Sequence, residues 1–251
     1  MTRLLDTASD VTDDAILNGR LRLFQPKRGH RFGHDAILLA AAVPAQSGQR
    51  VAEFGAGVGA ASLALLSRVP GVDATLFEID VSLCALARDN IARNGFAERA
   101  RVIQTDIAAL PAEQRLDHVF MNPPFNNTRH PSSPDPARRK AHTGAPDLLA
   151  LWTDRAHRCL RDGGMVTLIW RPDGLADILR VLTEGFGAVA ILPVYPAPGR
   201  PAIRVITQAE KGSGAPLRIL PPLILNDEDR HPSADAEAIL RTGASLPLTQ
   251  A

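Results

Sequence analysis

An alternation of short apolar runs and amphipathic stretches, beginning near residue 50, constrains the fold more than any other feature of this 251-residue chain. The apolar runs predict five strands, at residues 50–54, 74–78, 101–104, 117–121 and 165–170. The amphipathic stretches predict helices at residues 58–69, 82–94 and 148–160. Strands that alternate with helices of this length form right-handed βαβ units. The pattern therefore predicts an α/β fold with a doubly wound, mostly parallel sheet.

Additional elements are expected on both sides of this core. Asn18-Gly19 predicts a two-residue turn in an N-terminal β-hairpin. Residues 202–208 and 217–223 predict two antiparallel edge strands joined across residues 211–214, which would complete a seven-stranded sheet. A short helix is expected at residues 234–241. We thus divide one domain into an N-terminal hairpin and covering helix (1–48), a core (49–225) and a tail (226–251).

Composition excludes several classes of protein. Hydrophobic residues make up 45% of the chain and charged residues 22%, which is ordinary for a globular domain and excludes extended disorder. The longest apolar stretch, residues 36–43, is too short to span a membrane, and the N-terminus lacks an apolar signal core. Cys84 and Cys159 lie far apart, so we expect reduced thiols, a cytoplasmic location and no metal site.

A glycine-rich turn joins the first predicted core strand to the first core helix. Its sequence is Glu53-Phe54-Gly55-Ala56-Gly57-Val58-Gly59, at the open carboxyl end of the sheet where α/β folds bind ligands. Glycines let the backbone turn sharply and let a ligand approach it closely. A nucleotide-like cofactor is therefore implied. The spacing of Gly55, Gly57 and Ala60 also fits a dinucleotide site, and NAD stays an alternative on this turn alone.

Acidic residues near the turn favour S-adenosylmethionine. Glu53 directly precedes the glycines, where an anion suits a ligand with a sulfonium and an ammonium but would repel a pyrophosphate. Glu78 ends the second core strand and could hold ribose hydroxyls; Asp106 could accept from the adenine amino group. Asp80 is equally well explained as a helix N-cap. The predicted cofactor-binding residues are Glu53, Gly55, Ala56, Gly57, Gly59, Glu78, Ile79, Asp106, Ile107 and Asn122.

The tetrapeptide Asn122-Pro123-Pro124-Phe125 follows the fourth core strand directly. An exocyclic amine is a poor nucleophile because its lone pair is delocalised into the ring. The Asn122 side-chain oxygen and the Pro123 carbonyl could each accept one N–H and stabilise the charge that develops on the nitrogen. The two prolines stiffen this backbone, and Phe125 offers a face for stacking a base. We therefore predict that Asn122, Pro123, Pro124 and Phe125 are catalytic.

Together these motifs resemble the class I S-adenosylmethionine-dependent methyltransferases that modify amino nitrogens, and more narrowly the bacterial tRNA(Val) adenine-N6 methyltransferase family. The resemblance covers nearly the whole chain and rests on residues 24–40, the glycine turn, residues 77–80, Asp106, residues 122–125, residues 211–213 and residues 220–222. It implies a Rossmann-like fold, S-adenosylmethionine as cofactor and tRNA as substrate. Many relatives carry Tyr where this chain has Phe125, which keeps the stacking face without the hydroxyl.

The resemblance also implies that the segment before the core packs over the cofactor. Asp35 in that segment would either cap the helix at residues 36–43, the interpretation we favour, or lie near the methionine moiety. We expect no catalytic role for His30 or His34.

Two basic segments emerge when the net charge of +1 is divided along the chain. Residues 20–34 carry five cations and no acid, and residues 126–146 carry a net +3. Both flank the predicted site, so we expect them to contact tRNA phosphates. Alternative functions are a protein glutamine N5 methyltransferase or an rRNA guanine N2 methyltransferase, and a non-enzymatic or NAD-binding protein is the third class.

Overall fold

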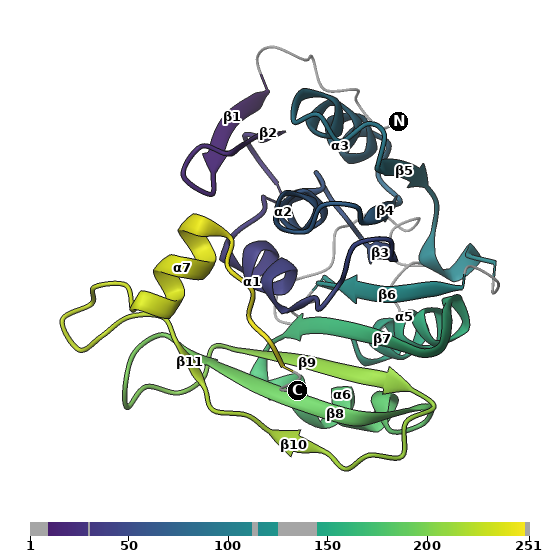
Figure 1. The fold of residues 1–251 in the computed structure, drawn as a ribbon, viewed down its shortest axis with the longest axis vertical. Coiled ribbons are helices and arrows are strands. Elements are labelled where there is room, and N and C mark those ends of the chain that lie inside the picture. Colours follow the sequence, from purple (N-terminus) through teal and green to yellow (C-terminus); the bar gives the residue numbers. More distant parts are fainter. Residues whose placement is uncertain (1–9, 30, 112–114, 125–144, 249–251) are drawn as a thin grey trace, which may run out of the picture.

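The computed structural model describes residues 10–29, 31–111, 115–124 and 145–248, and its core is one sheet with helices on both faces (Figure 1). The strands are β1 (Val11–Ile16), β2 (Leu21–Pro26), β3 (Arg50–Phe54), β4 (Asp73–Glu78), β5 (Ala100–Gln104), β6 (Leu116–Met121), β7 (Leu160–Trp170), β8 (Phe186–Tyr195), β9 (Arg204–Lys211), β10 (Arg218–Ile219) and β11 (Leu223–Ile224). The helices are α1 (His34–Ala42), α2 (Ala60–Arg68), α3 (Val81–Arg93), α5 (Ala145–Cys159), α6 (Leu175–Leu182) and α7 (Ala234–Thr242), with 3₁₀ turns η1 (Ile107–Ala109) and η2 (Pro172–Gly174).

Strand order confirms the doubly wound sheet, but the described residues form nine strands in it and not the predicted seven. The strands lie in the order β10-β8-β9-β7-β6-β3-β4-β5, and β11 also pairs with β8. β5, β4, β3, β6 and β7 are parallel, whereas β9 is antiparallel to both β7 and β8. The chain runs outward from β3 to β5 and then returns to place β6 on the other side of β3. Ligands bind at such a reversal, beyond the carboxyl ends of the strands.

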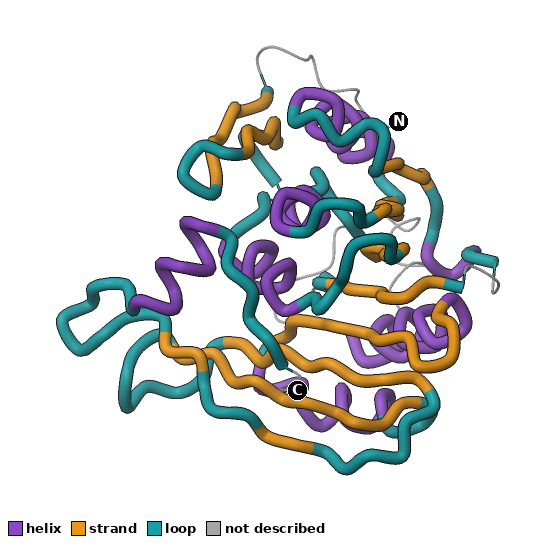
Figure 2. Tube along the Cα trace, viewed as in Figure 1, coloured by secondary structure: helices purple, strands orange, loops and turns teal. Residues whose placement is uncertain are grey.

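Alternating side chains of the strands divide the core into two layers. Val51 packs with the helices α1, α2 and α3, whereas Phe54 belongs to a second cluster with α5 and α6. The N-terminal hairpin β1–β2 joins the first layer, where Asn90 of α3 accepts from the Phe24 amide and donates to its carbonyl. Figure 2 shows the same arrangement, with strands between helices. Both faces of the parallel strands are therefore covered, which keeps the site at their ends fixed.

Local signals placed most of the core correctly, with some differences at its ends. α3 ends close to the predicted residue 94, and Gly95 follows it with φ +75°, a backbone typical of a glycine that closes a helix. The hairpin loop spans four residues, not two, because Ile16 pairs with Leu21. α5 begins at Ala145, three residues before the predicted start at residue 148, so Asp147 lies in its first turn and does not precede it as an N-cap.

The strand predicted at residues 202–208 is confirmed as the antiparallel strand β9, but its predicted pairing with residues 217–223 is wrong. Besides β7, β9 pairs with β8, a strand that we did not predict, and the predicted strand at 217–223 is instead two short strands that run parallel to β8. Pro193 inside β8 obscures the strand pattern, since proline cannot donate a ladder hydrogen bond. It is tolerated there because β10 ends opposite Ile191 and β11 begins opposite Val194.

Candidate active site

The glycine turn between β3 and α2 adopts the backbone that its sequence predicts. Gly55, Gly57 and Gly59 have φ values of +68°, +57° and +87°, which L side chains rarely adopt. The amides of Gly55 and Ala56 both donate to the Phe77 carbonyl of β4, at 2.9 and 3.0 Å. A Cβ on Gly55 would lie 2.6 Å from the Trp152 ring of α5. The turn is thus locked against the neighbouring strand and helix.

Glu78 braces this turn from the end of β4. Its Oε2 accepts from the Gly57 amide at 2.8 Å, and its Oε1 accepts from the Ile79 and Asp80 amides at 2.8 and 2.9 Å. The residue is buried, with 7% of its surface exposed. A carboxylate has about four acceptor positions, so a ligand hydroxyl can still bond to it.

Glu53 lies one strand away and is held differently. Its Oε2 accepts from the Ser62 amide at 2.9 Å and from the Ser62 hydroxyl at 2.5 Å. Burial, with a smaller contribution from the charge of Glu78, raises the pKa of the Glu53 carboxyl to about 8, although the hydrogen bonds from Ser62 act in the opposite direction. Near neutral pH the Glu53 side chain is therefore mostly protonated, and a cation placed beside it would favour ionisation.

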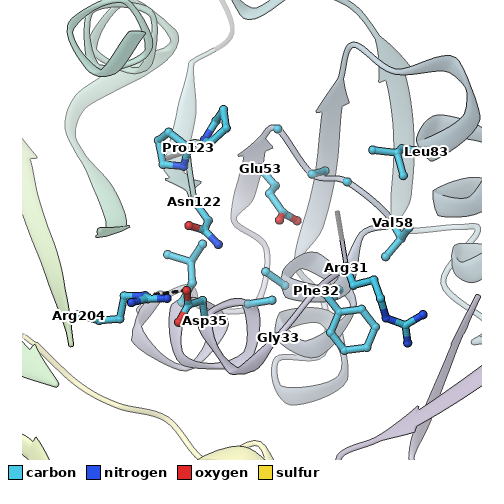
Figure 3. Close-up of a pocket in the computed structure, with 18 residues that line it drawn as sticks. Arg31, Phe32, Gly33, Asp35, Glu53, Val58, Leu83, Asn122, Pro123 and Arg204 are labelled. Carbon is cyan, nitrogen blue, oxygen red and sulfur yellow. Dashed lines mark hydrogen bonds and ion pairs between the residues drawn. The ribbon is translucent and has the colours of Figure 1, made fainter. Parts of the chain in front are cut away.

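Two adjoining cavities lie beside the turn and share part of their lining. The first, which we call the polar lobe, has a volume of about 420 Å³ and is lined by Glu53, Asp35, Arg204 and Asn122 among others (Figure 3). The second, the apolar lobe, has a volume of about 670 Å³. Its wall contains Glu78 and Asp106 and the apolar side chains of Phe77, Ile79, Leu83, Ile107, Leu148, Leu151 and Trp152. Gly55, Gly57, Leu83, Asn122 and Pro124 border both lobes.

Asn122 stands where the lobes meet, directly after β6. Its Oδ1 is buried and accepts no hydrogen bond from the described residues. Pro123 and Pro124 line the polar lobe beside it, and Phe125 lies outside the described residues. A buried acceptor without a donor costs free energy, which a ligand N–H would recover.

The remaining predicted acids have local partners. Asp80 caps α3 by accepting from the Ser82 and Leu83 amides, which confirms the capping interpretation. Asp106 accepts from the Ala108 amide and also lines the apolar lobe. Ile79 is 63% exposed at the rim of that lobe.

Asp35 does not cap α1, contrary to our expectation. The helix begins at His34 with Gly33 as its N-cap, so Asp35 lies inside the first turn. Its Oδ2 accepts instead from Nε of Arg204 at 2.7 Å, and both side chains line the polar lobe. Sequence reasoning missed Arg204, and it predicted the helix α5 without placing Leu148, Leu151 and Trp152 at a ligand site.

The first basic segment is partly neutralised by its own hairpin. Arg22 pairs with Asp13 at 2.9 Å, and Arg31 pairs with Asp14 at 3.1 Å. Hydrogen bonds from Arg93 and Arg22 lower the pKa of Asp13 to about 2. We did not count these strand β1 acids, because they precede the segment in sequence and meet it only by pairing. The second basic segment, 126–146, falls almost entirely outside the described residues.

Comparison with known proteins yields one family and several related chains. The model of the methyltransferase small domain family matches residues 30–193. A tRNA1(Val) (adenine(37)-N6)-methyltransferase of Aeromonas hydrophila is 33% identical, over 72% of this chain and 77% of that protein. Its namesake from Bacteroides thetaiotaomicron is 27% identical, over 82% and 81%. The crystal structure of a predicted O-methyltransferase from Agrobacterium tumefaciens is 27% identical with a TM-score of 0.72, over 85% of this chain and 98% of that chain. Residues 30–193 contain the glycine turn and Asn122 but not Arg204.

Within the described residues, no helix combines the length and apolar character that crossing a membrane demands.

Proposed function

The chain belongs to the methyltransferase small domain family, and from that premise we propose that it methylates the N6 nitrogen of an adenine in tRNA. It is an S-adenosylmethionine-dependent methyltransferase, as predicted. Support for the tRNA substrate comes from relatives named as tRNA1(Val) (adenine(37)-N6)-methyltransferases, which align over most of this chain.

We assign the two lobes to the two halves of the cofactor. The apolar lobe suits an adenosine: Ile79 and Ile107 offer apolar faces, Glu78 accepts from ribose hydroxyls and Asp106 accepts from the adenine amine. The Glu53 side of the polar lobe, beside the glycine turn, suits the charged amino-acid end. When bound, S-adenosylmethionine supplies an electrophilic methyl group on a sulfonium. The other predicted cofactor-binding residues, Ala56 and Gly59 among them, stay predictions.

The observation that carries the proposal is the buried Oδ1 of Asn122 at the junction of the lobes, which accepts no hydrogen bond from the residues that the structure describes. An exocyclic amine brings two N–H donors, and Asn122 and the Pro123 carbonyl are two acceptors fixed on stiff backbone. Accepting both N–H groups directs the nitrogen lone pair at the methyl carbon and stabilises the positive charge that forms there. This is positioning and electrostatic work, which requires no strong base.

The same acceptors argue against a hydroxyl substrate, although the Agrobacterium structure is described as a predicted O-methyltransferase. A hydroxyl has a single proton to donate, so one of the two acceptors would stay unsatisfied. An O-methyltransferase also gains from a group that takes the hydroxyl proton. Asn122 is an amide and cannot do so at neutral pH.

The test is nucleoside mass spectrometry of tRNA from cells with and without this protein. N6-methyladenosine should be absent without it and return with the wild-type gene. Asn122→Ala should abolish methyl transfer to purified tRNA while S-adenosylhomocysteine binding, measured by calorimetry, is retained. Asn122→Asp, which keeps an acceptor oxygen, is the matched control and should keep measurable activity. Normal turnover by Asn122→Ala would contradict the mechanism, and a methylated protein glutamine with unmodified tRNA would contradict the substrate.

A further inference from the structure

We propose that Arg204 recognises the acceptor base, donating from its guanidinium to a ring nitrogen adjacent to the exocyclic amine, and that Asp35 positions Arg204 for this contact. The inference rests on the proposed function, adenine N6 methylation, and adds a specificity-determining residue outside the range that the family model matches.

Strand order shows on which side of Asn122 the acceptor lies. Along the ligand-binding edge, the site residues follow the order of their strands: Glu78 ends β4, Glu53 lies in β3, Asn122 follows β6 and Arg204 begins β9. β9 is antiparallel to β7, so its first residue lies at the same edge as the carboxyl ends of the parallel strands. With the cofactor across β4 and β3, the acceptor amine at Asn122 extends away from them, toward β9.

The pair of Asp35 and Arg204 is built into the wall of that space. The two residues are 169 positions apart, and Nε of Arg204 donates to Oδ2 of Asp35 at 2.7 Å. Nη1 of Arg204 donates to the Ile203 carbonyl, also at 2.7 Å. Their side chains are 29% and 22% exposed, so each is mostly enclosed but still borders the cavity. Figure 3 shows the Asn122 carboxamide directed toward this pair from the opposite wall.

The chemistry of an adenine edge fits this arrangement. The N6 amine lies between N1 and N7, and both of these ring nitrogens are acceptors. Arginine carries only N–H donors in a rigid plane, and the contacts to Asp35 and Ile203 fix that plane. The Arg204 guanidinium, which lies beyond Asn122, therefore meets N1 in one orientation of adenine and N7 in the other. The N2 amine of guanine lies beside the N1–H donor, which would face the guanidinium in one orientation. Arg204 would thus help to select adenine.

The experiment uses the full-length protein and tRNA1(Val) molecules with adenine, 1-deazaadenine or 7-deazaadenine at the target position. Wild type should lose about tenfold to a hundredfold in kcat/KM on one of the two analogues, the range expected for one charged hydrogen bond. Arg204→Met should lose a similar factor in kcat/KM on adenine, and its kcat/KM on that analogue should be no lower than its kcat/KM on adenine. Asp35→Asn should lose activity in the same direction through misplacement of the guanidinium, and Arg204→Lys should recover part of the loss.

The controls separate this role from cofactor binding and from folding. Arg200→Met changes an exposed arginine four residues earlier. It should leave the ratio of kcat/KM on adenine to kcat/KM on each analogue unchanged. S-adenosylhomocysteine affinity and the melting temperature should be the same for Arg204→Met and wild type. If Arg204→Met loses S-adenosylhomocysteine affinity by the same factor as kcat/KM, the pair binds the cofactor. If Arg204→Met keeps full activity, Arg204 does not recognise the base. Either result overturns this inference and leaves the proposed function intact. If wild type forms no N6-methyladenosine, the proposed function falls as well.

Discussion

We expect the wild-type protein to release a proton from Glu53 when S-adenosylmethionine binds, and we expect Glu53→Gln to abolish this release. In the cofactor-free protein the Glu53 carboxyl is buried, and burial raises its pKa to about 8. A sulfonium and an ammonium arriving in the adjoining polar lobe favour the ionised form. Because the pKa of Glu53 then moves back toward its ordinary value of 4.5, binding releases a proton wherever the pH lies between the two values.

The magnitude follows from the size of that pKa shift. At pH 6 ionisation of Glu53 in the free protein costs about 2.7 kcal/mol, since the pH is two units below a pKa of about 8. The dissociation constant for S-adenosylmethionine should therefore fall about tenfold per pH unit, or about a hundredfold between pH 5 and pH 7. The cofactor's own α-amino group stays protonated over this window, since such groups titrate near pH 8.

The assay is isothermal titration calorimetry at pH 6 in two buffers that differ in ionisation enthalpy. Wild type should release close to one proton per cofactor bound, and Glu53→Gln should release markedly less and bind with a weaker dependence on pH. S-adenosylhomocysteine, which lacks the sulfonium charge, should release a smaller fraction of a proton from wild type. The same pH slope in wild type and Glu53→Gln would refute the assignment of this proton to Glu53.

Three stability measurements by urea unfolding test the surroundings of the site. Because the folded-state pKa of Glu53 is raised, its contribution to stability is fully present below about pH 4.5 and is lost as the pH rises toward 8. Between pH 5 and pH 8, the free energy of unfolding of the cofactor-free wild type should fall by on the order of 4 kcal/mol relative to that of Glu53→Gln. Gly55→Ala should cost about 2–3 kcal/mol, because its Cβ would lie 2.6 Å from Trp152, whereas Gly57→Ala has open space and should cost about 1 kcal/mol from its φ of +57°. Asp80→Ala should cost about 1 kcal/mol through loss of the α3 cap and leave cofactor affinity unchanged, and a large loss of affinity would show that Asp80 also contacts the ligand.

The parallel core could be predicted because its signals are local. Each strand from β3 to β6 is a short apolar run with a turn or cap directly after it, and parallel strands bring those turns to one edge of the sheet. Glu53, Glu78 and Asn122 follow from this rule alone, since each lies at or just after a strand end. The contacts that hold Glu53 required the structure, because its partner Ser62 lies on a helix whose packing no local pattern describes.

β8 and the Asp35–Arg204 pair could not be predicted from local sequence patterns, because both depend on contacts between distant segments. Sequence periodicity gives strands but not partners, and the antiparallel insertion of β9 between β7 and β8 is what brings Arg204 to the ligand-binding edge. The sequence predicts that Asp35 is a helix cap because aspartate is a favoured N-cap residue and an apolar helix follows it. In the structure the helix begins at His34, two residues earlier than predicted, and the Asp35 carboxylate bonds to a partner 169 positions away. A charged residue with an adequate local role can therefore belong to a site that exists only once distant strands have paired.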